Sequence, residues 1–539
     1  MGGTESIVSA RCCWLVTLVF IFSVGAVPVP GVAQEPEITD SPEMTLAAAV
    51  GLALRNNRTI KRAQVARAAQ EFAVRLQDSL FDPQLSVSTD TSITRTKQKK
   101  NEISSLVNQL AYTASITPTA TLKTELGTSF TLQFKNSYSY TKDRTSSGSN
   151  SRQFTVDPEL TIVQPLLKGV GSGVNTANLE IARLNTKLGR LNMRNTVAQI
   201  ITSVVNAYWQ VILNKERLNI ARLALSRARQ VWDINKSLVE SGRMAELDMV
   251  QTETDVAQKE FDLDVADNTY KQSKNTLLAL LALPKFIDFT PSALVDIEGV
   301  NVPLSIAYDL AEKNRFEIIQ AEVNRALAKI ALVVAKDGKK WDLNLTGTAG
   351  SNNARESIID AIKGIPVDSN TLSIGVNLVI PITSLAPESE VVSAKGNLRA
   401  ADLALEEAKQ TVRLNTQDSV RNVVANYRQL QLAENASALA ERQLTVERDK
   451  LSVGRSSNFQ VLTYQDTLRT TQLNEVSARV NYVTALANLD FALGTTLSTW
   501  NVETTDETAR MTKETPNSLP SRTLPADVKG GALPPPDER

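Results

Sequence analysis

The residues that most often perform catalysis or bind metals are scarce in this sequence. Its 539 residues contain no histidine, and the two cysteines, Cys12 and Cys13, are adjacent in an apolar run. Histidine is the commonest general base and metal ligand, and adjacent cysteines form neither a disulfide framework nor a four-ligand zinc site. The 58 Lys and Arg are balanced by 58 Asp and Glu. The chain therefore has no excess of basic residues with which to bind the phosphates of a nucleic acid. We therefore expect no metal site and no nucleic-acid partner.

One glycine-rich run, Gly169-Val170-Gly171-Ser172-Gly173, has the composition of a phosphate-binding loop. It lacks the Gly-Lys-Ser/Thr ending of such a loop, and it opens no βαβ unit. No nucleophile can be paired with a His or Cys base, although a Ser/Lys pair or paired carboxylates stay open. We expect no enzyme activity and no cofactor, and we interpret these glycines as the end of the segment before them.

The first 33 residues have the pattern of a secretory signal peptide. Residues 12–27 are apolar, and Gly31-Val32-Ala33 is a small-residue cleavage site before Gln34. The basic region is weak, with Arg11 set against Glu5, so the true translation start stays open. An uncleaved membrane anchor is the alternative, but the apolar core is shorter than the ~20 residues of a spanning helix.

Two very long helices are predicted to form the framework of the chain. Residues 176–241 and 387–453 carry apolar side chains at alternating spacings of three and four, which is coiled-coil periodicity. At 1.5 Å per residue each helix would be roughly 100 Å long. In the first helix the clearest run is Ala177, Ile181, Leu184, Leu188 and Leu191, and in the second it is Leu398, Ala401, Leu405, Ala408 and Val412.

The sequence also repeats itself, and the repeat includes these helices. A shift of 258 aligns residues 46–85 with residues 304–343 and gives 12 identities in 40 positions without a gap. Later matches follow a shift of 219 and then one of 212. The difference of 7 residues is one heptad, a length change that keeps the same side of a packed helix turned toward its neighbour. The glycine turns Gly242-Arg243 and Gly454-Arg455 correspond in this alignment. We therefore expect two tandem structural repeats.

Between the helices the periodicity changes from that of a helix to that of a strand. Residues 371–380 alternate apolar with small or polar side chains, and residues 130–140 and 154–162 do the same, with tyrosines at one end. About ten alternating residues edged by aromatics are typical of a transmembrane barrel strand. A half-buried sheet of a soluble protein would show the same alternation, so this alternative stays open.

The number of strands is not fixed by the pattern. Four segments of the first half read as strands, namely residues 83–94, 119–126, 130–140 and 153–164, with a tight turn at Gly127-Thr128 between the middle two. Long polar stretches separate the first pair and the last pair. Four or six strands per chain are both open, and six would give eighteen in a trimer.

In its order of motifs the chain resembles the TolC-type outer-membrane efflux family, over nearly all of residues 44–494. The duplication and spacing of the motifs are specific, although each motif alone is weak. They are Leu46-x-x-Ala49-x-x-Leu52-Ala53-x-x-Asn56 with its repeat at residues 304–314, Gln164-Pro165-Leu166-Leu167-Lys168-Gly169, Asn206-Ala207-Tyr208, and Gly242 followed by Leu247-Asp248.

This resemblance implies a mainly α-helical fold with a transmembrane β-barrel, in which the two repeats of long antiparallel coiled-coil helices and strands form a trimeric α/β-barrel channel. A β-sheet in lipid leaves no open edges, so closure by several chains is also physically reasonable. The implied division of the chain is as follows: 1–33 signal peptide; 34–82 first-repeat short helices; 83–165 first-repeat barrel strands; 166–302 first-repeat long helix, periplasmic turn and return helix; 303–340 second-repeat short helices; 341–381 second-repeat strands; 382–499 second-repeat long helix, turn and return helix; 500–539 disordered tail.

The function implied by the resemblance is that of a porin-like exit duct in the cell outer membrane of a Gram-negative-type bacterium, extending into the periplasm. The duct would belong to a tripartite efflux or type I secretion system and conduct passively. The implied partners are two further copies in a homotrimer, a periplasmic adaptor (membrane fusion protein), an inner-membrane pump of the RND, ABC or similar class, and outer-membrane lipid. The alternative is an exported soluble coiled-coil scaffold. The cargo, whether drug, metal ion or protein, and the pump class stay open.

The family also indicates where the partners dock. Adaptor hairpins contact the helix-to-helix turns at the periplasmic tips. Some members narrow the channel there with aspartate rings; Asp248 follows Gly242 by six, but Gln460 holds the matching position after Gly454. Asp248 and Gln460 are therefore a possible constriction, and whether an aspartate ring gates this end stays open. The predicted docking tips are Gly242, Arg243, Met244, Gly454, Arg455 and Ser456.

Overall fold

The structure is a computed structural model, which describes residues 43–100, 105–143, 150–242, 246–283, 288–292, 299–300, 302–363, 370–383, 385–452, 455–504 and 509–511. The chain divides into residues 1–42 and residues 43–539, and everything below concerns the second unit. The predicted signal peptide lies outside the described residues, as do Arg243, Met244 and Gly454.

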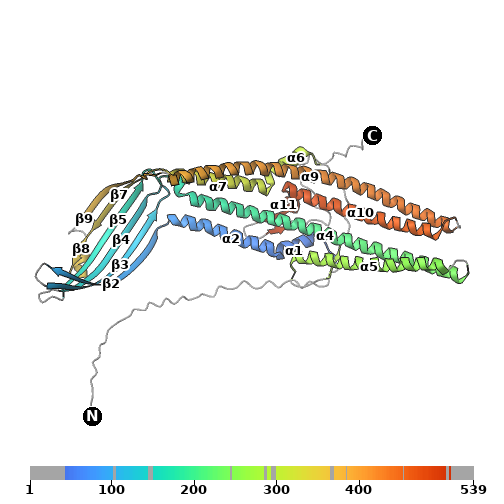
Figure 1. The fold of residues 1–539 in the computed structure, drawn as a ribbon, viewed down its shortest axis with the longest axis horizontal. Helices are drawn as coiled ribbons and strands as arrows, with labels where there is room; N and C mark the ends of the chain where they lie inside the picture. Colours follow the sequence, from blue (N-terminus) through green and yellow to red (C-terminus); the bar gives the residue numbers. More distant parts are fainter. Residues whose placement is uncertain are drawn as a thin grey trace, which may run out of the picture. The chain divides into compact units, whose positions relative to one another are not determined.

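Long helices make up most of the described chain, and Figure 1 shows them running side by side. The longest pair consists of α4 and α9, and each is followed, after a short connection, by a helix of 36 residues. The helices are α1 (Leu46–Asn56), α2 (Arg58–Asp78), α3 (Ser172–Asn175), α4 (Ala177–Glu240), α5 (Glu246–Leu281), α6 (Leu304–Asn314), α7 (Phe316–Gly338), α8 (Ile358–Lys363), α9 (Leu385–Ser452), α10 (Asn458–Leu493) and α11 (Thr496–Thr499), with a 3-10 turn η1 (Ser79–Phe81).

One large antiparallel sheet lies at the end of the helices opposite to the two short connections (Figure 1). Its strand order is β2-β3-β4-β5-β7-β9, and β8 continues the register of β7 along β5. Among the described residues, β2 and β9 have no strand partner on their outer edges. The strands are β2 (Gln84–Lys100), β3 (Ser105–Lys123), β4 (Ser129–Asp143), β5 (Ser151–Pro165), β7 (Asp342–Ser351), β8 (Asn353–Arg355) and β9 (Asn370–Val379); shorter pairs are β1 (Glu43–Met44) with β6 (Thr290–Pro291) and β10 (Val502–Thr504) with β11 (Ala509–Met511).

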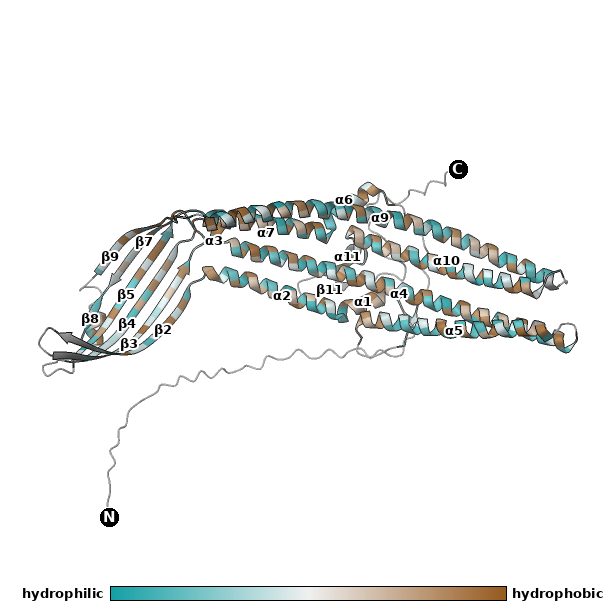
Figure 2. Ribbon diagram, in the orientation of Figure 1, coloured by the Kyte–Doolittle hydropathy of each residue, from teal (hydrophilic) through white to brown (hydrophobic). Residues whose placement is uncertain are grey.

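The register gives this sheet one apolar face. Leu132 pairs with Leu160, and Leu160 with Ala349, which in turn pairs with Leu372 on β9. The alternate positions carry polar side chains, and the carboxylates of Asp90, Asp157, Glu159 and Asp342 all belong to that second face. The alternating teal and brown of the strands in Figure 2 follows this pattern.

Glycine and carboxylate contacts join the sheet to the helices. The turn between β3 and β4 needs the positive φ of Gly127, +96°, and a Cβ there would meet the carbonyl oxygen of Gly169 at 2.4 Å. The backbone N–H of Gly169 donates to Oδ2 of Asp337 at 2.7 Å, and Nζ of Lys340 donates to Oδ1 of the same buried carboxylate at 2.7 Å. The end of α7 is thereby tied to the loop that follows β5.

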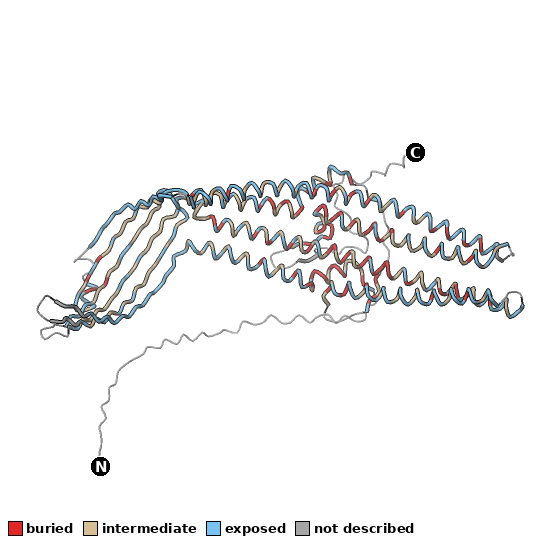
Figure 3. The backbone as a smooth tube through the Cα atoms, in the orientation of Figure 1, coloured by how far each residue is buried: buried red, intermediate tan, exposed pale blue. Residues whose placement is uncertain are grey.

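The hydrophobic core lies in the middle part of the helices, where Figure 3 shows most of the buried positions. The hydroxyl of the buried Tyr208 of α4 lies 2.8 Å from the backbone oxygens of both Met44 and Ser292, and its one proton donates to either of them. It thus holds the start of the described chain against the connection between α5 and α6. A second cluster packs α6 against α9 and α10 around Tyr482, whose hydroxyl accepts from the N–H of Val300.

In α4, the segment Ala177–Ser237 is long and apolar enough, by length and composition alone, to cross a membrane. Half of its most apolar window is buried by the rest of the protein. Packing against α5, α2, α10 and α1 accounts for this apolar character.

Three sequence expectations need correction. Residues 341–381, expected to contain only strands, also contain α8. The backbone carbonyl of Ser357 accepts the N–H of Ala361 at the start of this helix, and Ala361 is fully buried. The polar stretches that follow residues 94 and 140 are paired strand up to Lys100 and Asp143, and the strand expected at residues 119–126 is β3, which begins at Ser105 and ends at Lys123. In the tail expected to be disordered, β10 pairs with β11 because Val502 is buried against the core; residues 512–539 lie outside the described residues.

Candidate functional site

The two predicted tips lie at the same end of the helices, away from the sheet (Figure 1). The first is the turn between α4 and α5, and the second is the turn between α9 and α10. Long paired helices carry each turn, and α10 also packs against α4. The fold therefore presents two short turns at one end.

In the first turn, Gly242 ends α4 with a left-handed backbone, φ +68°. Its N–H donates to the carbonyl oxygen of Val239 at 2.9 Å, and the N–H of Ser241 donates to that of Ser237 at 3.2 Å. A side chain at Gly242 would meet nothing within 4 Å. The backbone angle therefore favours glycine here, and the space beside it is open.

The second turn is held by one carboxylate. The hydroxyl of Ser456 donates to Oε1 of Glu447 at 2.6 Å, and Nζ of Lys450 donates to Oε2 at 3.1 Å. The N–H of Arg455 donates to the carbonyl oxygen of Lys450 at 2.8 Å, and the Arg455 residue is exposed. The hydrogen bond from Ser456, and next the one from Lys450, lower the pKa of Glu447 below its ordinary value.

The two possible constriction residues occupy the first turns of the return helices. Gln460 is half-buried in α10, and its N–H donates to the hydroxyl of Ser457, the N-terminal cap of the helix, at 3.3 Å. Asp248 lies in α5, but its side chain is outside the described part of the chain. A constriction at these positions stays a prediction.

Charged side chains link the two helix pairs above the tips. Nζ of Lys259 in α5 lies 2.8 Å from Oδ1 of Asp466 in α10 and 3.5 Å from Oδ1 of Asp255. One helical turn away, Arg469 of α10 lies 3.9 Å from Asp262 of α5. The Lys259 side chain is only 10% exposed, so its charge is balanced inside the interface between the pairs.

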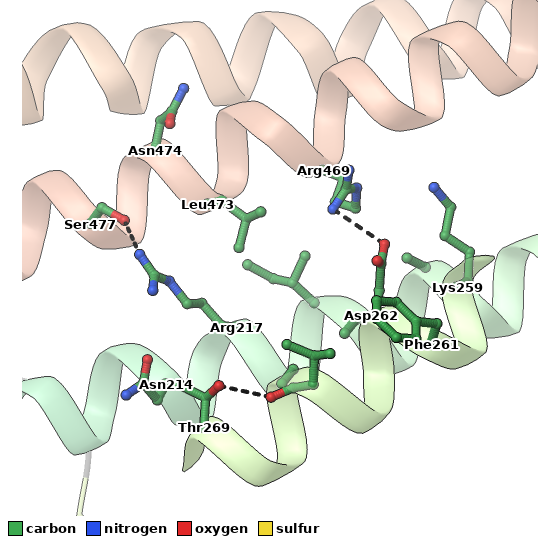
Figure 4. A pocket seen from close by; sticks show the side chains of 15 residues that line it. Asn214, Arg217, Lys259, Phe261, Asp262, Thr269, Arg469, Leu473, Asn474 and Ser477 are labelled. Carbon is green, nitrogen blue, oxygen red and sulfur yellow. Dashed lines mark hydrogen bonds and ion pairs between the residues drawn. The ribbon is translucent and has the colours of Figure 1, made fainter. Parts of the chain in front are cut away.

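Beside these ion pairs is a cavity of about 380 Å³ between α4, α5 and α10. Figure 4 shows Arg217 directed at Ser477 and Arg469 directed at Asp262. Leu473 and Phe261 supply apolar lining. Two polar contacts of this cavity cross between helices, Arg217 with Ser477 and Arg469 with Asp262.

The part of the chain that the structure describes contains no cluster of three or more His, Cys, Asp or Glu able to hold a metal ion. The described features at this end are two turns on long helices, and ion pairs that link the two helix pairs. Sequence reasoning missed Lys259, Asp466 and Glu447. The i,i+4 spacing of Asp255 and Lys259 was a signal, but the partner on α10 is 207 residues away in sequence.

Comparison with known proteins agrees with this architecture. The sequence profile described as "Outer membrane efflux protein" matches residues 49–283 and 307–495, which is more than half of the chain. The two matched stretches are separated by the connection between α5 and α6.

Among individual proteins, the chain is 26% identical to the pyoverdine export outer membrane protein OpmQ of Pseudomonas putida over 255 residues, 47% of this chain and 50% of that protein. It is 28% identical to outer membrane protein TolC of Salmonella enteritidis over 188 residues, 34% of this chain and 38% of that protein. The matches therefore span half or less of the length of these relatives.

Solved structures share the fold over a greater length. A crystal structure of CusC, described in terms of folding and transmembrane channel formation, aligns with a TM-score of 0.63 over 87% of this chain and 97% of that one, at 16% identity. The Campylobacter jejuni CmeC outer membrane channel aligns with a TM-score of 0.62 over 90% and 92%, at 14% identity.

Proposed function

Because the chain belongs to the outer membrane efflux protein family, we propose that it is the exit duct of a tripartite efflux or type I secretion system. The protein is an outer-membrane efflux channel of the TolC family and extends into the periplasm. The observation that carries the proposal is that one chain contains both an antiparallel sheet and helices of 64 and 68 residues. The sheet is apolar on one face, and within the described residues both of its edge strands are unpaired on their outer sides.

The open edges support closure of the barrel by several copies. Strand direction alternates across β2-β3-β4-β5-β7-β9, so β2 and β9 run in opposite directions. The β9 edge of one copy can then pair antiparallel with the β2 edge of the next, and no edge is left facing lipid. Three copies give eighteen strands, a number that leaves an aqueous channel. Six strands from one chain could not enclose such a channel.

The surface of α9 supports the homotrimer independently. From Val392 onward its large exposed apolar residues are separated by 11, 11, 18, 7 and 7 positions, each close to a whole number of helical turns. They form a single stripe, and a stripe of this kind is expected to be covered by another helix. The members are Val392, Leu403, Leu414, Leu432, Leu439 and Val446.

The tandem repeat belongs to the same proposal. Helices α1 and α6 have 11 residues each, α5 and α10 have 36 each, and α4 and α9 have 64 and 68. These matching lengths follow the alignment of residues 46–85 with residues 304–343. Two such halves in each of three copies would give a helical barrel with sixfold pseudosymmetry.

We further propose that a periplasmic adaptor docks on the tips, that an inner-membrane pump supplies the cargo, and that the duct itself conducts passively without catalysis. Gly242, Arg455 and Ser456 are the described members of this surface. The exposed Arg455 beside a turn braced by Glu447 offers a fixed cation to the adaptor. The pyoverdine export role of the OpmQ relatives makes a small exported molecule one cargo to test.

Planar-bilayer recording of the purified protein tests this function. An exit duct gives stable single-channel currents whose size scales with salt concentration. In parallel, extraction of membranes with high salt must leave the protein in the membrane fraction. Release by salt together with absence of current would favour the exported scaffold instead.

A further inference from the structure

The outer end of the apolar face of the sheet carries rings and cations in neighbouring rows. Tyr112 pairs with Tyr140, which pairs with Arg152, and one row toward the helices Tyr138 pairs with Phe154, which pairs with Arg355. In the next row away from the helices, beyond Tyr112 and Tyr140, Lys142 pairs with Leu110, which pairs with Arg95. We call Arg95, Lys142, Arg152 and Arg355 the cationic patch.

The rings form direct contacts. Tyr112 and Tyr140 are stacked with centroids 6.2 Å apart, and Tyr138 and Phe154 lie 4.8 Å apart. The guanidinium of Arg152 lies 5.8 Å from the Tyr140 ring centroid. Aromatic residues of a transmembrane barrel gather at the membrane–water boundary. These four rings therefore mark that boundary on the side away from the helices.

The length of β4 agrees with this position. From Tyr140 to Phe130, the first apolar ring at the helix-proximal end, is a step of ten residues on one face. Ten residues span roughly 33 Å along a strand, or about 25 Å across the membrane at a tilt of about 40°. This equals the height of the apolar band of a transmembrane barrel. The cationic patch therefore lies at the level of the lipid headgroups.

Charge on this face has one sign. No Asp or Glu occupies it at any described position of β2, β3, β4 or β5, whereas the acidic side chains of the strands lie on the opposite face. Arg152 and Lys142 are exposed at its outer end. Basic residues at a membrane surface attract anionic headgroups, and guanidinium groups suit phosphate oxygens.

We infer that the cationic patch binds the phosphate of a lipid headgroup in the outer leaflet, with the acyl chains lying on the apolar face below the rings. This inference rests on the proposed placement of the sheet in the outer membrane. It adds a lipid site to the channel, and it assigns to Lys142 and Arg152 a role separate from conduction.

The test is native mass spectrometry of the full-length trimer in an uncharged detergent. Two probes with identical acyl chains are added separately: phosphatidic acid and diacylglycerol, which lacks the phosphate. The variant K142Q/R152Q removes two charges from the patch. The control K123Q/K135Q removes two charges from the opposite face, and K142R/R152K keeps both charges in place.

Phosphatidic acid is expected to bind the native protein and diacylglycerol is not. K142Q/R152Q should weaken binding about 30-fold, from two basic residues at about 1 kcal/mol each. K123Q/K135Q and K142R/R152K should bind the lipid within about threefold of the native protein. K142Q/R152Q and K142R/R152K should keep the bilayer conductance of the native protein. A hundredfold excess of inorganic phosphate should leave the lipid bound.

Equal binding of the two lipids, equal losses in both glutamine variants, or displacement by inorganic phosphate would each overturn the inference; the last would indicate a site for free anions. Absence of current from the native protein is a separate result, which counts against the exit duct. The amount of trimer recovered shows whether K142Q/R152Q folds. If it does not, the single variants K142Q and R152Q, each expected to weaken binding about fivefold, decide the question.

Discussion

The ammonium of Lys259 in α5 lies 2.8 Å from the Asp466 carboxylate in α10 and joins the return helices of the two helix pairs. Asp255 adds a second carboxylate at 3.5 Å, one turn earlier in α5. A lysine that is 10% exposed is tolerated at this interface because both carboxylates face it. Separation of the two helix pairs at this level would have to break this contact.

Replacing Lys259 by methionine should therefore destabilise the protein. We expect a loss of about 1 to 2 kcal/mol, below the ~3–5 kcal/mol of a fully buried pair, because the Asp466 side chain is 54% exposed and stays solvated. Denaturant unfolding followed by circular dichroism measures the loss. K271M is the control, since the Lys271 side chain is 69% exposed and pairs with Asp267 of its own helix. A double-mutant cycle with D466N that gave no coupling would refute this assignment.

Acid should loosen the second tip before the rest of the protein. The pKa of Glu447 is lowered in the folded state by Ser456 and Lys450, so its stabilising contribution is full above the unfolded pKa of about 4.3 and is lost as pH falls through the folded pKa.

Hydrogen exchange at the start of α10, measured from pH 6 to pH 3, should show this loss. In the E447Q variant these amides should exchange faster at pH 6 than in the native protein. Their protection should then change little between pH 6 and pH 3, because the variant has no carboxylate at position 447 to protonate. Identical profiles for native and variant protein would show that Glu447 does not hold the turn.

A bulky residue at Gly242 should impair efflux without reducing the amount of trimer. Gly242 and Gly171 both have positive φ, +68° and +98°, and a Cβ added at either would meet no atom within 4 Å. Phenylalanine at the left-handed Gly242 should cost about 1 kcal/mol. Gly171 also has ψ 153°, a backbone region essentially confined to glycine, so G171F should cost more, about 1–3 kcal/mol, although only Gly242 lies at the tip. In cells whose drug resistance depends on this protein, G242F should lower resistance and G171F should not. Equal resistance in both would argue against docking at this turn.

The link between α7 and the loop after β5 should contribute measurably to stability. Asp337 is 4% exposed and accepts from Gly169 and Lys340. D337A should cost about 2 kcal/mol, the range for hydrogen bonds to a buried charge. E388A removes the neighbouring Lys339–Glu388 pair, in which both side chains are about half exposed, and should cost less than about 1 kcal/mol. The denaturation midpoints of D337A and E388A, each compared with the native protein, measure the two losses of stability. Equal losses would contradict the larger role assigned to Asp337.

Periodicity was sufficient to predict the long elements. The three-four spacing located α4 to within one residue at each end, and the turn at Gly127 follows from its neighbours along the chain. The outer part of β2 was missed because Thr, Lys and Gln there carry no alternation, and cross-strand pairing keeps it extended. The outer part of β3 was missed although Leu110, Tyr112 and Ile116 do alternate with small or polar residues there. Helix α8 was missed because burial of Ala361, a tertiary contact, defines it.

The site was predictable only where it depends on local sequence. The glycine turns were visible because a left-handed residue must be glycine or a near equivalent. Glu447 was not, since its role depends on Ser456 folding back across the turn. The pairing of Lys259 with Asp466 depends on how two distant helices face each other, which no local pattern encodes.

The most direct test of the proposed channel is electron cryo-microscopy of the protein reconstituted in lipid, at a resolution that separates strands. We predict three copies around one eighteen-stranded barrel, with β9 of each copy paired with β2 of the next and a lumen continuous into the helical barrel. A different copy number, a twelve-stranded barrel, or β2 paired with β9 of the same chain would contradict this prediction.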